Sequence, residues 1–386
     1  MLNVGFAATN PCHLYPLAQA LGTLGCPLAY YSGYPRWRLP QPHPEPIATH
    51  SARTLVTYGL LKLPERLRPR SRTLFRWQDR HFDEWVGRHL DGRHDFVHAM
   101  PGQAWATFRS ARQRGVRAVL NHATGPSRHW VAVMRPEYER IGLSVQETTV
   151  YDEDFWRREE HEYALADWHC AASTLVRDQL IRAGVAADRI WVVPYGAAPD
   201  VFYAAPESPP RGPLRLLFAG QVSLRKGLVT LLAALGQVGR PEWSLKVVGA
   251  VADEARPDLR TYLGRTPVEF CGAVTQARLA AEMRQASVLV LPSLEEGFGL
   301  VVVQALACGL PCVVSDAVGA KDLLQHRANG SIFPARDSGA LAQELLFWAE
   351  HPRRVSGDYS WRAPAQILYD SSRQALRSTL AQPQAP

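Results

Sequence analysis

Residues 214–350 alternate short apolar runs with helical segments, and this alternation limits the possible folds of the chain most strongly. The segments between the apolar runs have helical spacing, as with Leu279 and Met283, which lie four residues apart. Apolar strands separated by helices form a parallel sheet with both faces covered. We expect strands at 214–220, 244–250, 268–272, 287–293, 311–316 and 331–335, and helices at 227–238, 275–286, 300–309 and 338–350.

The first half of the chain repeats this pattern more loosely. We expect strands at 2–9, 95–100, 117–123, 166–173 and 189–196, and helices at 13–25 and 173–184. The strongest break in composition is PESPPRGP, 206–213, because proline resists both helix and sheet. With 386 residues the chain is long enough for two domains. We therefore predict a domain over 1–205, a linker over 206–213, a second domain over 214–360 and a final helix over 361–380. That helix either crosses back to the first domain or lies on the surface.

The composition is that of an ordinary globular protein, with 46% apolar and 20% charged residues. No stretch reaches the roughly 18–20 apolar residues of a membrane-spanning helix, and the first residues lack the basic leader of a signal peptide. The six cysteines form no CxxC motif, which favours reduced thiols. We expect a cytoplasmic protein, with Cys308 and Cys312 packed at a helix end and a strand rather than binding metal.

The segment FAGQVSLRKG, 218–227, has the features of a diphosphate-binding loop. An expected strand ends at Gly220, the loop carries Arg225 and Lys226, and Gly227 opens a helix. Glycine permits close backbone approach, and a helix N-terminus offers free N–H groups with partial positive charge. A tight turn with two solvated cations fits the same residues, so this segment alone leaves both interpretations open. The chain has no GxxxxGKS/T motif, which argues against ATPase chemistry.

The segment 292–316 places two carboxylates before a glycine-flanked helix start. Glu295 and Glu296 precede GFG and an apolar helix. A carboxylate beside free helix amides is suited to binding sugar hydroxyls. Gln304, eight residues after Glu296, lies about two helical turns further on. The alternative is a capping acid with a buried glutamine, and for Glu295 we favour the cap.

A third segment, 166–202, combines a strand, a serine, a helix and VVPYG. In this order, the three segments resemble glycosyltransferase family 4, retaining enzymes of the glycosyl transferases group 1 that have the GT-B fold. That family shows an AD…S…L…G…I.VVPNG-like stretch, a G(R)xxxxKG diphosphate loop, and a PS..EGFG helix followed by ACG.PVV.S/TD. The resemblance covers about 165–335 well, and more loosely the first strand and 117–130.

The resemblance implies an α/β protein of GT-B fold, with two Rossmann-like domains facing each other across a cleft. The first domain would bind the acceptor and the second the nucleotide sugar. The implied activity is retaining transfer of a sugar from a nucleotide-diphosphate donor to a lipid-linked, glycan or small-molecule acceptor. Neither a cofactor nor a metal is implied, and the DED sequence at 152–154 is interpreted as a solvated helix start.

The resemblance also assigns roles to individual residues. Lys226, with Arg225 beside it, would neutralise the donor diphosphate, and Glu296 would bind hydroxyls of the donor sugar. His122 matches a strand-end histidine near that sugar, with His129 as an alternative. The implied donor-binding residues are Gly220, Gln221, Gly272, Val274, Gly297, Phe298, Gly299, Leu300 and Gln304.

The chain departs from the family pattern at three places. Gln221 stands where the family usually has arginine, and Gln304 where it has a second glutamate. AATNPCHLYP replaces the family's N-terminal glycine-rich loop, which makes Thr9, Asn10 and His13 candidates for acceptor-side groups. The two glutamines leave a non-catalytic nucleotide-sugar binder as one alternative, and a sugar-nucleotide epimerase of the same fold is a second.

The chain has a net charge of +7, and residues 51–120 carry a local excess of positive charge, with 14 basic and 6 acidic residues. The densest part, 62–80, mixes arginine with leucine, phenylalanine and tryptophan. It either lies on an anionic membrane surface, which would make the protein peripheral at the inner membrane face, or forms a solvated helix with an ordinary core face. Nucleic acid is not expected as a partner, because no recognition motif accompanies the charge.

Overall fold

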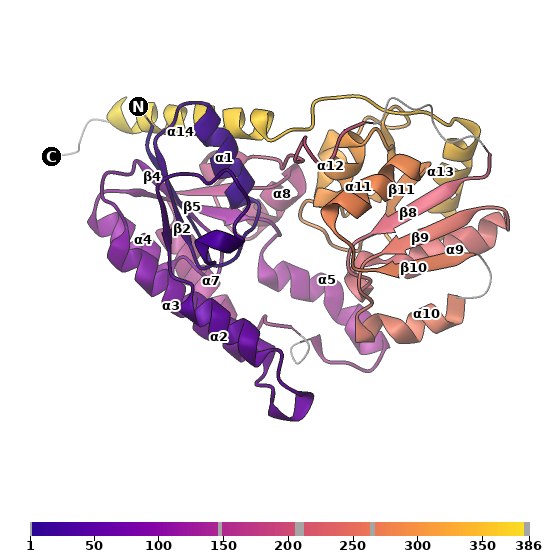
Figure 1. Cartoon of the computed structure of the whole chain (residues 1–386), viewed down its shortest axis with the longest axis horizontal. Coiled ribbons are helices and arrows are strands. Elements are labelled where there is room, and N and C mark those ends of the chain that lie inside the picture. Colours follow the sequence, from indigo (N-terminus) through magenta and orange to yellow (C-terminus); the bar gives the residue numbers. More distant parts are fainter. Residues whose placement is uncertain (1, 146–148, 205–211, 263–266, 382–386) are drawn as a thin grey trace.

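The computed structural model describes residues 2–145, 149–204, 212–262 and 267–381, which form two parallel sheets side by side (Figure 1). The first sheet has the strand order β3-β2-β1-β4-β5-β6-β7. Its strands are β1 (Val4–Ala8), β2 (Leu28–Ser32), β3 (Ile47–Thr49), β4 (Phe96–Ala99), β5 (Arg117–His122), β6 (Trp168–Ala171) and β7 (Ile190–Val192). The strands expected in this half are present. The sequence analysis missed β2 and β3, which extend the sheet at one edge.

The second sheet has the order β10-β9-β8-β11-β12-β13 and is also parallel throughout. Its strands are β8 (Arg215–Ala219), β9 (Ser244–Val248), β10 (Val268–Gly272), β11 (Val288–Leu291), β12 (Cys312–Ser315) and β13 (Gly330–Phe333). Every strand predicted for this half is confirmed. The order places β8 beside β11, so the loops after these two strands meet at the same edge of the sheet.

Helices connect the strands and cover both sheets. In the first half they are α1 (Leu14–Thr23), α2 (Ala52–Leu60), α3 (Ser71–His89), α4 (Trp105–Gln113), α5 (Ser127–Arg140), α7 (Glu153–Leu165) and α8 (Thr174–Arg182). In the second half they are α9 (Leu228–Val238), α10 (Arg256–Tyr262), α11 (Gln276–Gln285), α12 (Leu300–Ala307) and α13 (Ser338–Glu350). Asp152 caps α7 by accepting from the amides of Asp154 and Phe155, as expected for the DED helix start.

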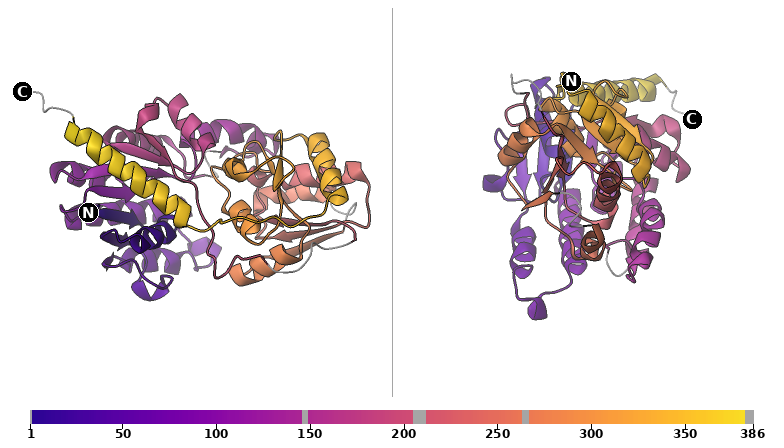
Figure 2. Two further views of the ribbon diagram at one scale, coloured as in Figure 1. Left: turned by 90° about the horizontal axis from the view of Figure 1, so that it is seen from above. Right: turned by 90° about the vertical axis from the view of Figure 1, so that its right-hand side faces the viewer.

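The last helix, α14 (Arg362–Ala381), returns to the first half of the molecule. It packs against α1. Figures 1 and 2 show it lying across the first half of the molecule, along the upper side in the view of Figure 1. The predicted linker 206–213 lies largely outside the described residues. The largest buried apolar cluster joins the halves, since it includes Phe6 and Val119 as well as Leu289 and Val314.

The cysteines are free thiols, and Cys308 and Cys312 are buried at the end of α12 and the start of β12, as predicted. Among the helices that the structure describes, none is long and apolar enough to cross a membrane.

Candidate active site

A cavity of about 690 Å³ lies where the carboxyl ends of the two sheets meet. Open parallel sheets bind their ligands at this edge. The first half of the chain lines it with Cys12, His13, Ala123, Thr124 and Tyr195. The second half lines it with Ala219, Gly220, Gln221, Lys226, Val248, Gly249, Ala250, Ala273, Val274, Leu279, Glu296, Phe298, Gly299, Leu300, Val301 and Gln304. The predicted donor-binding residues are therefore mostly gathered in one place.

The loop after β8 packs closely against a neighbouring segment of the chain where it leads into α9. A short 3₁₀ turn, Leu224–Lys226, leads into Gly227, whose φ is 63°. A Cβ at Gly227 would lie 2.1 Å from the carbonyl oxygen of Pro292, so only glycine fits there. This contact locks the loop against the segment that carries Glu296. Lys226 is consequently buried, with 9% of its surface exposed, although it lines the cavity.

Lys226, Arg225 and Glu296 form a charged cluster at the cavity. Lys226 Nζ donates to Glu296 Oε2, and Arg225 Nη1 donates to the same oxygen at 2.9 Å. Burial raises the pKa of the Glu296 carboxyl, but the two cations outweigh this effect and hold the pKa below its usual value. Burial lowers the pKa of the Lys226 ammonium, and Glu296 offsets part of that shift. Two cations share one carboxylate here, which leaves capacity for an anionic ligand.

Glu295 does not cap a helix, so that interpretation was wrong. The N-cap of α12 is Gly299, and Glu295 lies 2% exposed with no hydrogen-bond partner for either carboxyl oxygen among the described residues. The nearest cation is Arg225, with Nη1 3.8 Å from Oε2. Burial, only partly offset by Arg225, raises the pKa of Glu295 to about 7.

The raised pKa predicts a pH-dependent stability that Glu295→Gln removes. Between the ordinary value of 4.5 and about 7, the folded protein holds a proton that the unfolded chain releases. Stability therefore falls as the pH rises through this window, by up to about 3 kcal/mol. We expect Glu295→Gln to raise the midpoint of thermal unfolding at pH 8 and to leave it unchanged at pH 4.5. The exposed Glu350→Gln is the control, and equal pH profiles for wild type and Glu295→Gln would contradict the prediction.

The helix α12 begins at the cavity wall. Gly299, at φ 93°, is its N-cap, and as a glycine it provides no side-chain hydrogen bond to the first amides of the helix. Phe298, Leu300 and Gln304 line the cavity around this helix start. Free amides at a helix N-terminus favour an anion. The charged cluster and α12 thus present positive potential to the same cavity.

Two predicted glycines lie beside the cavity without lining it. Gly297 meets the first half of the chain: its Cβ, if present, would lie 2.2 Å from the carbonyl oxygen of Ala123, and its own carbonyl accepts from Ser173 Oγ at 2.7 Å. Gly272 ends β10, and its carbonyl accepts from the amide of Gly249 at 2.8 Å. Gly297 therefore serves close packing between the halves.

The structure does not bring His122 to the cavity. Its ring is 1% exposed, and Nε2 lies 2.9 Å from Nδ1 of His169 on β6. Burial and the neighbouring His169 hold the pKa of His122 well below its usual value, so the ring is a neutral part of the core. His129 does not line the cavity either. The candidate role of His122 beside the donor sugar has no geometric support here.

His13 is the histidine that lines the cavity from the first half of the chain. Its ring stacks on Tyr195 at 4.3 Å between centroids, and Tyr195 contacts Phe298 at 4.8 Å. Burial lowers the pKa of His13 to about 3, so the imidazole is neutral. The sequence analysis did not select Tyr195, although its place near the carboxyl end of the expected strand 189–196 was a usable signal. Thr9 and Asn10 do not line this cavity.

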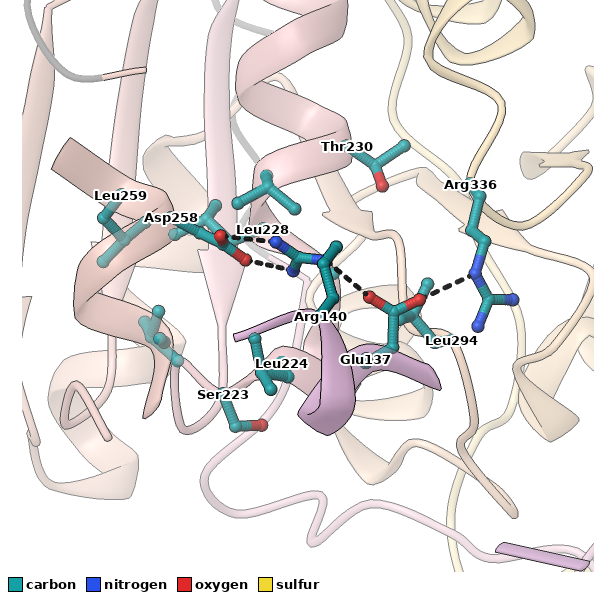
Figure 3. A pocket seen from close by; sticks show the side chains of 14 residues that line it. Glu137, Arg140, Ser223, Leu224, Leu228, Thr230, Asp258, Leu259, Leu294 and Arg336 are labelled. Carbon is teal, nitrogen blue, oxygen red and sulfur yellow. Dashed lines mark hydrogen bonds and ion pairs between the residues drawn. The ribbon is translucent and has the colours of Figure 1, made fainter. Parts of the chain in front are cut away.

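Helix α5 supports the charged loops from behind. It extends from the first half beneath the second, and a separate cavity of about 310 Å³ lies beside it (Figures 1 and 3). Arg140 pairs with Asp258 through two bonds of 2.8 and 2.5 Å, and Glu137 accepts from Arg336 at 2.9 Å. This chain of ion pairs ties the two halves together next to the loop that carries Lys226.

Within the ranges described, no group of three His, Cys, Asp or Glu side chains is arranged to hold a metal ion. Glu296 is the one carboxylate among the described residues that line the larger cavity. The positive charge that faces a ligand there comes from Lys226 and the start of α12, whereas Arg225 contacts Glu296 from behind and does not itself line the cavity.

Residues 213–351 match the family model of the glycosyl transferases group 1. The chain is 34% identical over 196 residues to phosphatidyl-myo-inositol mannosyltransferase of Mycobacterium leprae. The aligned region is 47% of this chain and 51% of that protein. The chain is also 27% identical over 302 residues to glycogen synthase of Mycobacterium tuberculosis, and this region is 72% of this chain and 68% of that protein. The chain thus spans about half the length of the first of these relatives.

Solved structures resemble the chain over nearly its whole length. Sucrose-phosphate synthase from Thermosynechococcus elongatus has a TM-score of 0.67 at 21% identity, covering 98% of this chain and 100% of that one. The Anabaena protein HepE, in complex with UDP, has a TM-score of 0.64 at 16% identity, covering 99% and 100%. These likenesses confirm the GT-B fold that the sequence resemblance implied.

Proposed function

We propose that this protein transfers a sugar from a nucleotide-diphosphate donor to an acceptor, because residues 213–351 match the family model of the glycosyl transferases group 1. The observation that carries this proposal is the pair of Lys226 and Glu296 in a cavity between the two sheets, with Arg225 bonded to Glu296 just outside the cavity lining. HepE, described in complex with UDP and with UDP-glucose, supports a donor of this class.

Lys226, Arg225 and the start of α12 would hold the donor diphosphate. Gln304 would hydrogen-bond the ribose, since its side chain both donates and accepts. Glu296 would accept hydrogen bonds from hydroxyls of the sugar. Positioning and stabilisation of the developing diphosphate charge then account for catalysis without a metal.

We propose retention of anomeric configuration, as the family resemblance implies, and the charges around the cavity support a route without a carboxylate nucleophile. A double displacement needs a carboxylate nucleophile, and Glu296 is held by two cations that reduce its basicity. We therefore favour attack on the same face that the diphosphate leaves. The acceptor oxygen bonds to the anomeric carbon, the bond from that carbon to the phosphate oxygen breaks, and the departing phosphate oxygen takes the acceptor proton.

The direct test incubates the protein with a panel of nucleotide sugars, with and without lipid-linked, glycan and monosaccharide acceptors. Release of nucleoside diphosphate that depends on an acceptor supports transfer, and NMR of the product gives its anomeric configuration. Conversion of the donor with no acceptor present would indicate an epimerase. Donor binding without turnover would indicate that Gln221 and Gln304 mark a non-catalytic binder.

His13→Ala is expected to lower kcat/KM for the acceptor about tenfold, because it removes one neutral hydrogen-bonding group from the cavity wall. Nucleotide affinity should stay unchanged, since the diphosphate is held by the second half of the chain. Steady-state kinetics checks this, with His129→Ala as the control outside the cavity. Equal kcat/KM for His13→Ala and wild type would show that His13 does not contact substrate.

A further inference from the structure

Helix α2 exposes two of its aliphatic side chains and buries its two threonines. Leu55 and Val56 are 44% and 48% exposed, whereas Thr54 and Thr57 are buried. The hydroxyl of Thr57 has no hydrogen-bond partner within the described part of the chain. A helix that stabilised only this fold would bury the leucine and valine instead. The exposed face of α2 is therefore suited to an apolar environment outside the molecule.

A basic tip follows α2 directly. The 3₁₀ turn Glu65–Leu67 carries Leu67, which is 70% exposed, between the exposed Arg66 and Arg68. Residues 61–72 include Lys62, Arg66, Arg68, Arg70 and Arg72 and a single acidic residue, Glu65. Exposed aliphatic side chains flanked by cations match the chemistry of a surface with anionic headgroups over hydrocarbon.

The shape of the molecule leaves this tip accessible. The connection between α2 and α3 projects beyond both halves of the protein in two perpendicular views (Figures 1 and 2). The rest of the basic stretch behaves differently: Leu74, Phe82 and Val86 of α3 are buried. Residues 71–80 thus belong to a helix with an ordinary core face, and the exposed apolar groups lie on α2 and the tip.

We propose that α2 and the tip, residues 52–70, dock this protein on an anionic lipid bilayer. Leu55, Val56 and Leu67 would enter the boundary between headgroups and acyl chains, and the arginines would lie among the headgroup phosphates. A second copy of the chain does not fit this surface, because the tips would repel each other. Nucleic acid would satisfy the cations but leave the aliphatic side chains without a partner.

Co-sedimentation with lipid vesicles tests the proposal without donor or acceptor, so its result is independent of the glycosyltransferase activity. We expect binding to vesicles of phosphatidylcholine mixed with phosphatidylglycerol, weakening as salt is added, and little binding to phosphatidylcholine alone. Each neutralised cation in Arg66→Gln, Arg68→Gln and Arg70→Gln should lower the partition coefficient about fivefold. The double variant Leu55→Ser, Val56→Ser should lower it about tenfold.

The matched control is Leu346→Ser on α13, which removes a leucine of similar exposure, 37%, from the other half of the molecule. Circular dichroism and the thermal midpoint establish that each variant is folded. The proposal is overturned if the wild type does not bind anionic vesicles, or if the α2 and tip variants bind as tightly as the control. Binding to DNA or RNA without binding to vesicles would also overturn it.

Discussion

Lys226→Ala is expected to lower turnover by a factor on the order of 10²–10³, the effect of losing one preorganised group that stabilises developing charge. Lys226 is buried at the cavity, is locked in place through Gly227, and shares Glu296 with Arg225. Its ammonium cannot be replaced by a solvent cation, because the surrounding loop leaves little exposed surface. Arg225 remains in the variant and accounts for the residual activity.

Initial rates with saturating donor measure this effect. Lys246→Ala is the control, because it removes a lysine that pairs with Glu282 away from the cluster. If Lys226→Ala turned over as fast as Lys246→Ala, the assignment of Lys226 to the donor diphosphate would be incorrect.

Glu296→Ala is expected to abolish most sugar transfer, by a factor on the order of 10² or more, while the variant keeps its affinity for the nucleoside diphosphate. The carboxylate is the one acidic group among the described cavity-lining residues, so no neighbour takes over its contacts with sugar hydroxyls. Its removal also frees Lys226 and Arg225 of their shared counter-ion. The diphosphate should therefore bind at least as tightly as in the wild type.

Calorimetric titration with nucleoside diphosphate, together with transfer rates, separates the two roles. Glu296→Gln preserves the shape of the side chain and should show the same split between lost transfer and retained binding. If nucleotide affinity fell as much as turnover in both variants, Glu296 would be a residue of the fold rather than a ligand of the sugar.

The second sheet could be predicted from the sequence because its strands are continuous apolar runs between helices. The first sheet was harder to predict. β2 is a short strand flanked by Pro27 and Gly33, and residues of these types are typical of turns. β3 is an edge strand of three residues whose side chains are half-buried or exposed, so it has no apolar pattern. Lys226 and Glu296 lie together because they follow strands β8 and β11, which are neighbours in the sheet, and their roles toward a donor stay a prediction.

Side-chain direction was the part that the sequence did not reveal. Glu295 and Glu296 are adjacent in the irregular loop between β11 and α12, yet Glu295 is buried without a hydrogen-bond partner in the described part of the chain and Glu296 lines the cavity. No sequence periodicity fixes side-chain direction in such a loop. His122 has the expected place at a strand end, but its ring faces His169 on the neighbouring strand. Only the packing of α7 and β6 around it decides that direction.

The most direct test of the central claim is a thermal-shift measurement with UDP, GDP, ADP, TDP and CMP, each with and without EDTA. A ligand at 100 times its dissociation constant adds about 2.7 kcal/mol, which raises the midpoint by a few degrees. We predict a selective shift from one nucleoside diphosphate that EDTA does not change and that Lys226→Ala reduces. The absence of a shift with every nucleotide would contradict a nucleotide-sugar site at Lys226, Arg225 and Glu296.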